Sequence, residues 1–130
     1  DDAVMNVFTP GSHGSTYGGN PLACAVAEAA LDVLVDEKLN ERSAELGAYM
    51  LEKIQAMASP HVAEVRGLGL WIGVQLKPEA GGARRFCEAL KQRGMLCKET
   101  HEHTIRFAPP LVIERTEIDW ALERIAEVLG

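Results

Sequence analysis

Residues 66–76 read Arg-Gly-Leu-Gly-Leu-Trp-Ile-Gly-Val-Gln-Leu, and this stretch decides the fold class of the chain. Its first four residues carry two glycines and predict a turn into a strand. The apolar residues at positions 70, 72, 74 and 76 then alternate with Trp71, Gly73 and Gln75, which is the two-residue period of a strand with one buried face. We therefore expect a sheet that needs cover on one side only.

Helical patterns flank this strand on both sides and are the natural cover. The sequence predicts helices over residues 21–36, 37–58 and 82–93, and a final helix that Thr116 opens with Asp119 as its capping partner. Short strands are expected near residues 95–99 and 104–108. The inward-facing side chains of the last two helices are predicted to be Ala83, Phe86, Cys87, Leu90, Ile118, Ala121, Leu122, Ile125 and Leu129. Three short strands with helices packed on one face indicate an α+β fold.

Length and composition limit the possible functions. The chain has 130 residues, which suit one hydrophobic core, and no apolar run long enough to span a bilayer. A net charge of −6 and a single basic pair, Arg84-Arg85, argue against a nucleic-acid partner. Three widely spaced cysteines predict neither a disulfide framework nor a zinc site, so we expect reduced thiols and a soluble, cytoplasmic protein.

A glycine-rich loop precedes the first long helix and contains two adjacent hydroxyls, Ser15 and Thr16. Asn20 can cap the helix and Pro21 suits its first turn, so N–H groups and hydroxyls converge where the helix dipole favours an anion. The pattern matches neither the Walker phosphate loop nor the dinucleotide fingerprint. An ordinary turn, whose hydroxyls satisfy local backbone groups, is the alternative.

Two further groups of side chains are possible sites. Arg106 lies on a predicted strand, and paired prolines fix the exit of that strand toward whatever Arg106 faces; a solvated surface arginine is the alternative. His101 and His103 stand near Glu99 and Glu102, but no third ligand is placed by spacing, so no metal site is expected.

Four stretches of this chain resemble the class III pyridoxal-phosphate-dependent aminotransferases. They are residues 13–24, 65–70, 94–101 and 104–113, so the similarity covers nearly the whole chain. The resemblance implies the C-terminal small domain of the aspartate-aminotransferase-like fold (fold type I). It implies that residues 1–36 are the tail of the large cofactor-binding domain and that residues 37–130 are the small domain.

The same resemblance implies roles for three residues. Ser15 and Thr16 match the loop that reaches across the dimer to the phosphate of the neighbouring subunit's cofactor, and Arg106 matches an arginine that binds a substrate carboxylate. The lysine that holds the cofactor covalently has no counterpart here: the five lysines, Lys38, Lys53, Lys77, Lys91 and Lys98, stand in amphipathic or loop contexts. We expect no catalytic residue in this chain and no transamination by it alone.

Within the class, the Ser15-Thr16-Tyr17 order and the run from Ile105 to Pro110 favour the ornithine branch. This implies a homodimer that moves the terminal amino group of ornithine to 2-oxoglutarate. The alternatives are the acetylornithine and 4-aminobutyrate branches, or a non-enzymatic interaction domain derived from the same fold.

Overall fold

The computed structural model describes residues 1–130, and the chain forms two compact units, Asp1–Glu37 and Lys38–Gly130. The first unit contains α1 (Asp2–Met5) and α2 (Pro21–Asp36). The predicted start of α2 is confirmed: the Asn20 side chain accepts a hydrogen bond from the N–H of Ala23 at 3.1 Å, and Pro21 occupies the first turn.

No residue of α2 is buried, although most of its side chains are apolar. Leu22, Val26 and Val35 are each more than half exposed. The first unit by itself therefore does not supply the cover that such a helix requires.

The second unit contains an antiparallel sheet of four strands in the order β1-β2-β4-β3. The strands are β1 (Val62–Leu68), β2 (Trp71–Leu76), β3 (Lys98–Thr100) and β4 (Thr104–Phe107). The expectation of three strands was wrong, because the sheet contains a fourth strand, β1. Residues 66–68, which the sequence analysis placed in a turn, are the end of this strand. β1 is an edge strand with an irregular register between Val62 and Glu64 and no fully buried residue, so its sequence lacks the alternation that marks β2.

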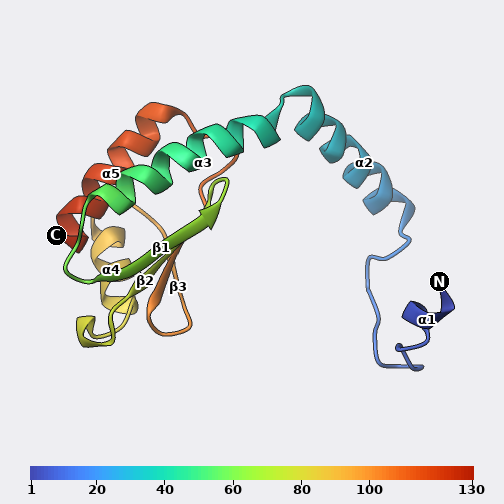
Figure 1. Ribbon diagram of the computed structural model, residues 1–130. Helices are drawn as coiled ribbons and strands as arrows, with labels where there is room; N and C mark the ends of the chain where they lie inside the picture. The colour runs from blue at the N-terminus through green and yellow to red at the C-terminus, as the bar shows by residue number, and fades with distance from the viewer. The chain divides into compact units, whose positions relative to one another are not determined.

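Three helices cover one face of this sheet, as the sequence predicted (Figure 1). They are α3 (Leu39–Ala56), α4 (Arg84–Gln92) and α5 (Arg115–Leu129), and a short helical turn, η1 (Pro78–Ala80), precedes α4. All nine side chains predicted to face inward from α4, its N-cap and α5 are buried. They meet a layer from β2 and β4 formed by Ile72, Val74, Leu76, Ile105 and Phe107. The outer face of the sheet carries no helix of this unit.

The β1–β2 hairpin turns over two residues, and α3 packs directly on it. Gly69 has φ +55°, a left-handed conformation that glycine adopts without strain. The Ser43 hydroxyl of α3 accepts a hydrogen bond from the N–H of Leu70 at 3.1 Å. A Cβ on Gly47 would lie 2.1 Å from the Gly69 carbonyl, so only glycine allows this approach of helix and turn.

The cap of α5 differs from the predicted one. Glu114 is the N-cap residue and exchanges hydrogen bonds with Glu117 in a capping box, whereas Thr116 and Asp119 were expected to form it. Asp119 instead accepts a hydrogen bond from the Tyr49 hydroxyl of α3. The helix begins one residue earlier than Thr116 because Glu114 can cap it.

Candidate functional site

The glycine-rich loop before α2 has backbone donors and hydroxyls in close succession. Gly19 has φ +75°, which lets the chain turn into the capped helix start. The Ser15 hydroxyl accepts a hydrogen bond from the N–H of Gly18 at 2.8 Å, and the Ser12 hydroxyl donates one to the Thr9 carbonyl at 2.7 Å. Some hydroxyl groups of the loop therefore already form hydrogen bonds within the loop itself.

Thr16 differs from its neighbour in this respect. It is exposed, and its hydroxyl has no hydrogen-bond partner in the chain. The Ser15 hydroxyl already accepts one hydrogen bond, but its own proton remains free to be donated. The donor set of this loop suits phosphate oxygens, with Thr16 the more available side chain.

Arg106 lies on β4, on the face of the sheet opposite the helices. Its backbone partners are Gly73 on β2 and Lys98 on β3. The side chain is exposed, and it has no carboxylate partner, in contrast to Arg66 and Arg84, which pair with glutamates. A guanidinium with no partner is available to an incoming carboxylate.

A pocket of about 580 Å³ surrounds Arg106. The buried Thr104 is part of its wall, and the Thr104 hydroxyl donates a hydrogen bond to the Gln75 side-chain oxygen at 2.7 Å. The residues that line it are Arg66, Gly67, Trp71, Gly73, Thr100, His101, Thr104 and Arg106. Sequence reasoning missed Arg66 because it assigned this residue to a turn; as part of a strand paired with β2, it faces the same way as Arg106.

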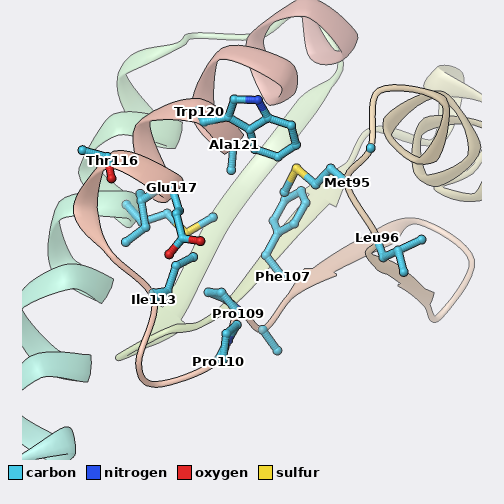
Figure 2. Close-up of a pocket in the computed structure, with 14 residues that line it drawn as sticks. Met95, Leu96, Phe107, Pro109, Pro110, Ile113, Thr116, Glu117, Trp120 and Ala121 are labelled. Atoms are coloured by element: carbon cyan, nitrogen blue, oxygen red, sulfur yellow. The ribbon is translucent and has the colours of Figure 1, made fainter.

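A second cavity of the unit, about 640 Å³, lies apart from Arg106 (Figure 2). Met95, Phe107 and Trp120 supply much of its apolar wall, and Pro109 and Pro110 lie at one end. Its only ionisable side chain, Glu117, is already bonded to the N–H of Glu114 at 2.8 Å. Arg106 does not line it, so this cavity offers little to a charged small molecule.

The other reactive side chains form no second centre. No group of three His, Cys, Asp or Glu side chains is placed to hold a metal ion. Burial raises the pKa of the Cys97 thiol to about 12, and burial also raises the pKa of Cys87, so both thiols stay protonated at neutral pH. None of the five lysines is buried, and none lines the pocket of Arg106. No helix of the structure has both the length and the apolar character needed to cross a membrane.

Comparison with known families decides what kind of protein this is. The family described as "Aminotransferase class-III" matches residues 1–129. The chain belongs to the class III aminotransferases. The resemblance seen in the sequence is thereby confirmed, and so is the α+β fold, which aminotransferase structures share.

The most similar relatives point to one branch of this family. The ornithine aminotransferase of Geobacillus sp. (strain WCH70) is 61% identical over 127 residues, covering 98% of this chain and 31% of that relative. The ornithine aminotransferase of Bacillus subtilis (strain 168) is 57% identical over 129 residues, covering 99% of this chain and 31% of that relative.

Solved structures of class III aminotransferases superpose on the whole chain. Ornithine delta-aminotransferase from Plasmodium falciparum gives a TM-score of 0.84 at 40% identity, covering 98% of this chain and 34% of that structure. Acetylornithine aminotransferase from Elizabethkingia anophelis gives a TM-score of 0.81 at 43% identity, covering 99% of this chain and 35% of that structure. The chain thus spans about a third of the length of its relatives.

Proposed function

We propose that this chain is part of an ornithine aminotransferase, in which it supplies the small domain and one loop of the cofactor site. The whole enzyme transfers the terminal amino group of ornithine to 2-oxoglutarate. The observation that carries the proposal is Arg106, an exposed guanidinium without an ion-pair partner that lines a pocket of a class III aminotransferase chain. The names of the relatives, which are 56–61% identical, support ornithine as the amino donor.

Arg106 has the properties that a carboxylate-binding residue needs. Its planar guanidinium offers two parallel N–H donors to a carboxylate. Because no glutamate in the chain holds it, binding of a carboxylate breaks no ion pair at this residue. We assign it to the carboxylate beside the reacting carbon of 2-oxoglutarate or glutamate.

Pyridoxal phosphate, when bound, supplies the electron sink for transfer of the amino group. The loop residues fit the phosphate end of this cofactor, since Thr16 has a free hydroxyl and Ser15 has a free proton beside a helix N-terminus. In the proposed homodimer, the loop serves the cofactor of the neighbouring subunit. Thr16 is the principal contact and Ser15 the second.

The chain has no lysine suited to hold the cofactor covalently, so activity belongs to the full-length dimer, which we place in the cytoplasm. In the full-length protein, residues 1–36 are proposed to be the tail of the large domain and residues 37–130 the small domain. The exposed apolar side chains of α2 support this assignment, since they need cover from outside their own unit.

One second candidate has a specific observation in its favour. The acetylornithine aminotransferase of Elizabethkingia anophelis has a TM-score and an identity close to those of the Plasmodium enzyme, so the fold does not separate the two donors. The deciding experiment offers ornithine, N-acetylornithine and 4-aminobutyrate to the full-length protein with 2-oxoglutarate. We expect kcat/KM for ornithine to exceed the other two by at least roughly tenfold. A preference for N-acetylornithine would assign the chain to the acetylornithine aminotransferases. No turnover of any donor would favour a non-enzymatic role.

A further inference from the structure

Two of the three cysteines meet where α4 packs beside β3. Cys87 lies on α4 and is buried, and Cys97 directly precedes β3 and is partly buried. Their thiols are hydrogen-bonded to each other, and Cys97 packs against the core cluster that contains Cys87. The third cysteine, Cys24, is exposed on α2 in the other unit. The second unit therefore holds one pair of thiols in contact.

The way in which α4 ends brings the two cysteines to the same level. Gly94 has φ +84°, which stops the helix, and the N–H of Met95 donates a hydrogen bond to the Leu90 carbonyl at 3.0 Å. The helix rises about 4.5 Å over the three residues between Cys87 and Leu90. Two residues of extended chain cover about 6.6 Å. The chain after Met95 therefore returns along the helix and reaches Cys97 beside Cys87.

A second contact fixes the register of α4 against β3. Arg84, three residues before Cys87, pairs with Glu99, two residues after Cys97, at 3.2 Å. Residues three apart on a helix lie on the same side, and alternate residues of a strand point the same way. The helix and the strand are thus held together on both sides of the two cysteines. This arrangement keeps the thiols adjacent in the folded unit.

The two sulfurs differ in how easily a reagent reaches them. Cys87 is 7% exposed, whereas Cys97 is partly open to solvent and its neighbour Leu96 is 82% exposed. Burial raises the pKa of both thiols, so the thiolate that attacks disulfides is a minor species at neutral pH. Oxidation of the pair is therefore slow, and Cys97 is the sulfur that a reagent meets first.

From these contacts we infer that Cys87 and Cys97 are a modification site, which small-molecule disulfides such as oxidised glutathione convert into an intramolecular disulfide. The Cys97 Sγ attacks one sulfur of the reagent, forms a mixed disulfide and releases one glutathione. The Cys87 Sγ then attacks the Cys97 Sγ, and the second glutathione leaves. Two cysteine thiols are oxidised, one reagent disulfide is reduced, and the two thiol protons pass to the two released glutathiones.

The bond would join α4 to the start of β3, where Lys98 is the backbone partner of Arg106 on β4. The inference stands apart from the proposed function, since the reaction needs neither pyridoxal phosphate nor an amino donor. It is also compatible with reduced thiols under ordinary conditions, because the disulfide forms only when an oxidant is supplied.

The test treats the full-length protein with oxidised glutathione at about pH 8.5, where more of each thiol is ionised than at neutral pH. The reaction is stopped in acidic urea, and the remaining thiols are blocked with N-ethylmaleimide before digestion. Trypsin cleaves after Lys91 and Arg93, so the two cysteines fall in separate peptides, residues 86–91 and 94–98. We expect mass spectrometry to find these peptides mainly as a disulfide-linked pair, which dithiothreitol separates again.

Three variants identify the reacting sulfurs. Cys87→Ser should retain glutathione on Cys97, because no second thiol can displace it. Cys97→Ser should slow the reaction of Cys87 at least about tenfold, since a buried sulfur is hard to reach. Cys24→Ser is the matched control and should leave the linked peptides unchanged. Circular dichroism reports whether each variant is folded.

Three results would overturn the inference. The first is glutathione on the exposed Cys24, which proves the reagent active, while residues 86–91 and 94–98 are recovered only as unlinked, blocked peptides. The second is a linked pair that appears only when urea is present during oxidation, which would mean that the folded protein keeps the sulfurs apart. The third is undiminished reaction of Cys87 in Cys97→Ser, which would contradict entry through Cys97.

Discussion

At the scale of single residues, the arginines differ in what their guanidinium groups contact. Arg85 and Arg115 lie over the rings of Phe86 and Tyr49. Five arginines, Arg42, Arg66, Arg84, Arg93 and Arg124, contact glutamates, and these exposed ion pairs contribute little to stability. Arg106 has no such partner and lines the pocket of about 580 Å³ on the open face of the sheet. Its guanidinium can therefore contact a ligand from outside the chain, as a binding residue must.

The proposed role of Arg106 predicts unequal damage to two half-reactions. Ornithine reacts through its distal amine, so its carboxylate lies far from the reacting carbon, whereas 2-oxoglutarate reacts beside its own carboxylate. In the full-length enzyme, Arg106→Lys keeps the charge and loses the planar fork, so it should slow the 2-oxoglutarate half-reaction about 10- to 100-fold. Single-turnover kinetics should show a much smaller effect with ornithine. Equal losses in both would mean that Arg106 only supports the fold, and Arg93→Lys is the control.

Thr16 carries the corresponding prediction for the cofactor. Removing one hydrogen bond to a charged phosphate should weaken retention of pyridoxal phosphate by about 1.5 to 3 kcal/mol. Thr16→Ala in the full-length enzyme tests this by equilibrium dialysis, and Thr16→Ser should restore most of the affinity. Ser12→Ala is the matched control, because its hydroxyl already donates to the Thr9 carbonyl. Unchanged affinity in Thr16→Ala would remove the assignment.

At the scale of elements, the contact between α3 and the β1–β2 hairpin holds the outer strand of the sheet in place. The Ser43 hydroxyl satisfies the N–H of Leu70, and Gly47 lets the helix backbone approach the turn at Gly69. The position of Arg66 on β1 depends on this contact, although it lies on the opposite face of the sheet.

Substitution of Gly47 tests how much that contact contributes to the free energy of unfolding. Gly47→Ala should raise the helix propensity by about 1 kcal/mol, but the added methyl would overlap the backbone of Gly69. We expect a net loss of about 1 to 3 kcal/mol in the free energy of unfolding, because overpacking against backbone is not easily relieved. Urea denaturation of the chain measures it. Ala48→Gly at the exposed neighbouring position should cost about 1 kcal/mol through propensity alone; a Gly47→Ala variant more stable than the parent would contradict the packing argument.

At the scale of the whole molecule, the chain spans about a third of the length of its class III relatives. Its two units differ in how much core each one has. The second unit buries a continuous core, whereas no side chain of α2 is buried. The loop that would hold the phosphate thus belongs to a unit that needs cover from elsewhere. Residues from this chain and from the rest of the protein are both needed for the proposed reaction.

This incompleteness predicts the behaviour of the isolated chain with the cofactor. Mixed with pyridoxal phosphate, reduced with borohydride and desalted, it should show no stoichiometric adduct at one lysine by peptide mass spectrometry. The reason is that its lysines are exposed or half-exposed and none lines the pocket of Arg106. The full-length protein, treated in parallel, should carry one adduct outside this segment. A unique adduct within residues 1–130 would refute the claim that the chain lacks the cofactor lysine.

The sequence alone determined the extents of the long helices and of β2, and the buried faces of β2 and α5. The extents of α2 and of the strand around Ile72, and the inward stripe of α5, follow from periodicity and capping, which are local properties of the chain. It also indicated the family through residues 13–24 and 104–113, and the family match over residues 1–129 confirms it. These local patterns can be interpreted without knowing which helices and strands contact one another.

Only the tertiary structure decided the rest. β1 has no buried alternation of its own and is a strand because it pairs with β2, so the sequence reading took its end for a turn. The cap of α5 at Glu114 and the approach of Gly47 to Gly69 likewise depend on which groups come within contact distance. Arg66 and Arg106 are 40 positions apart in the sequence, and they line one pocket because each pairs with Gly73 in the sheet. Contacts between residues distant in sequence arise from packing of the whole unit, which no local pattern encodes.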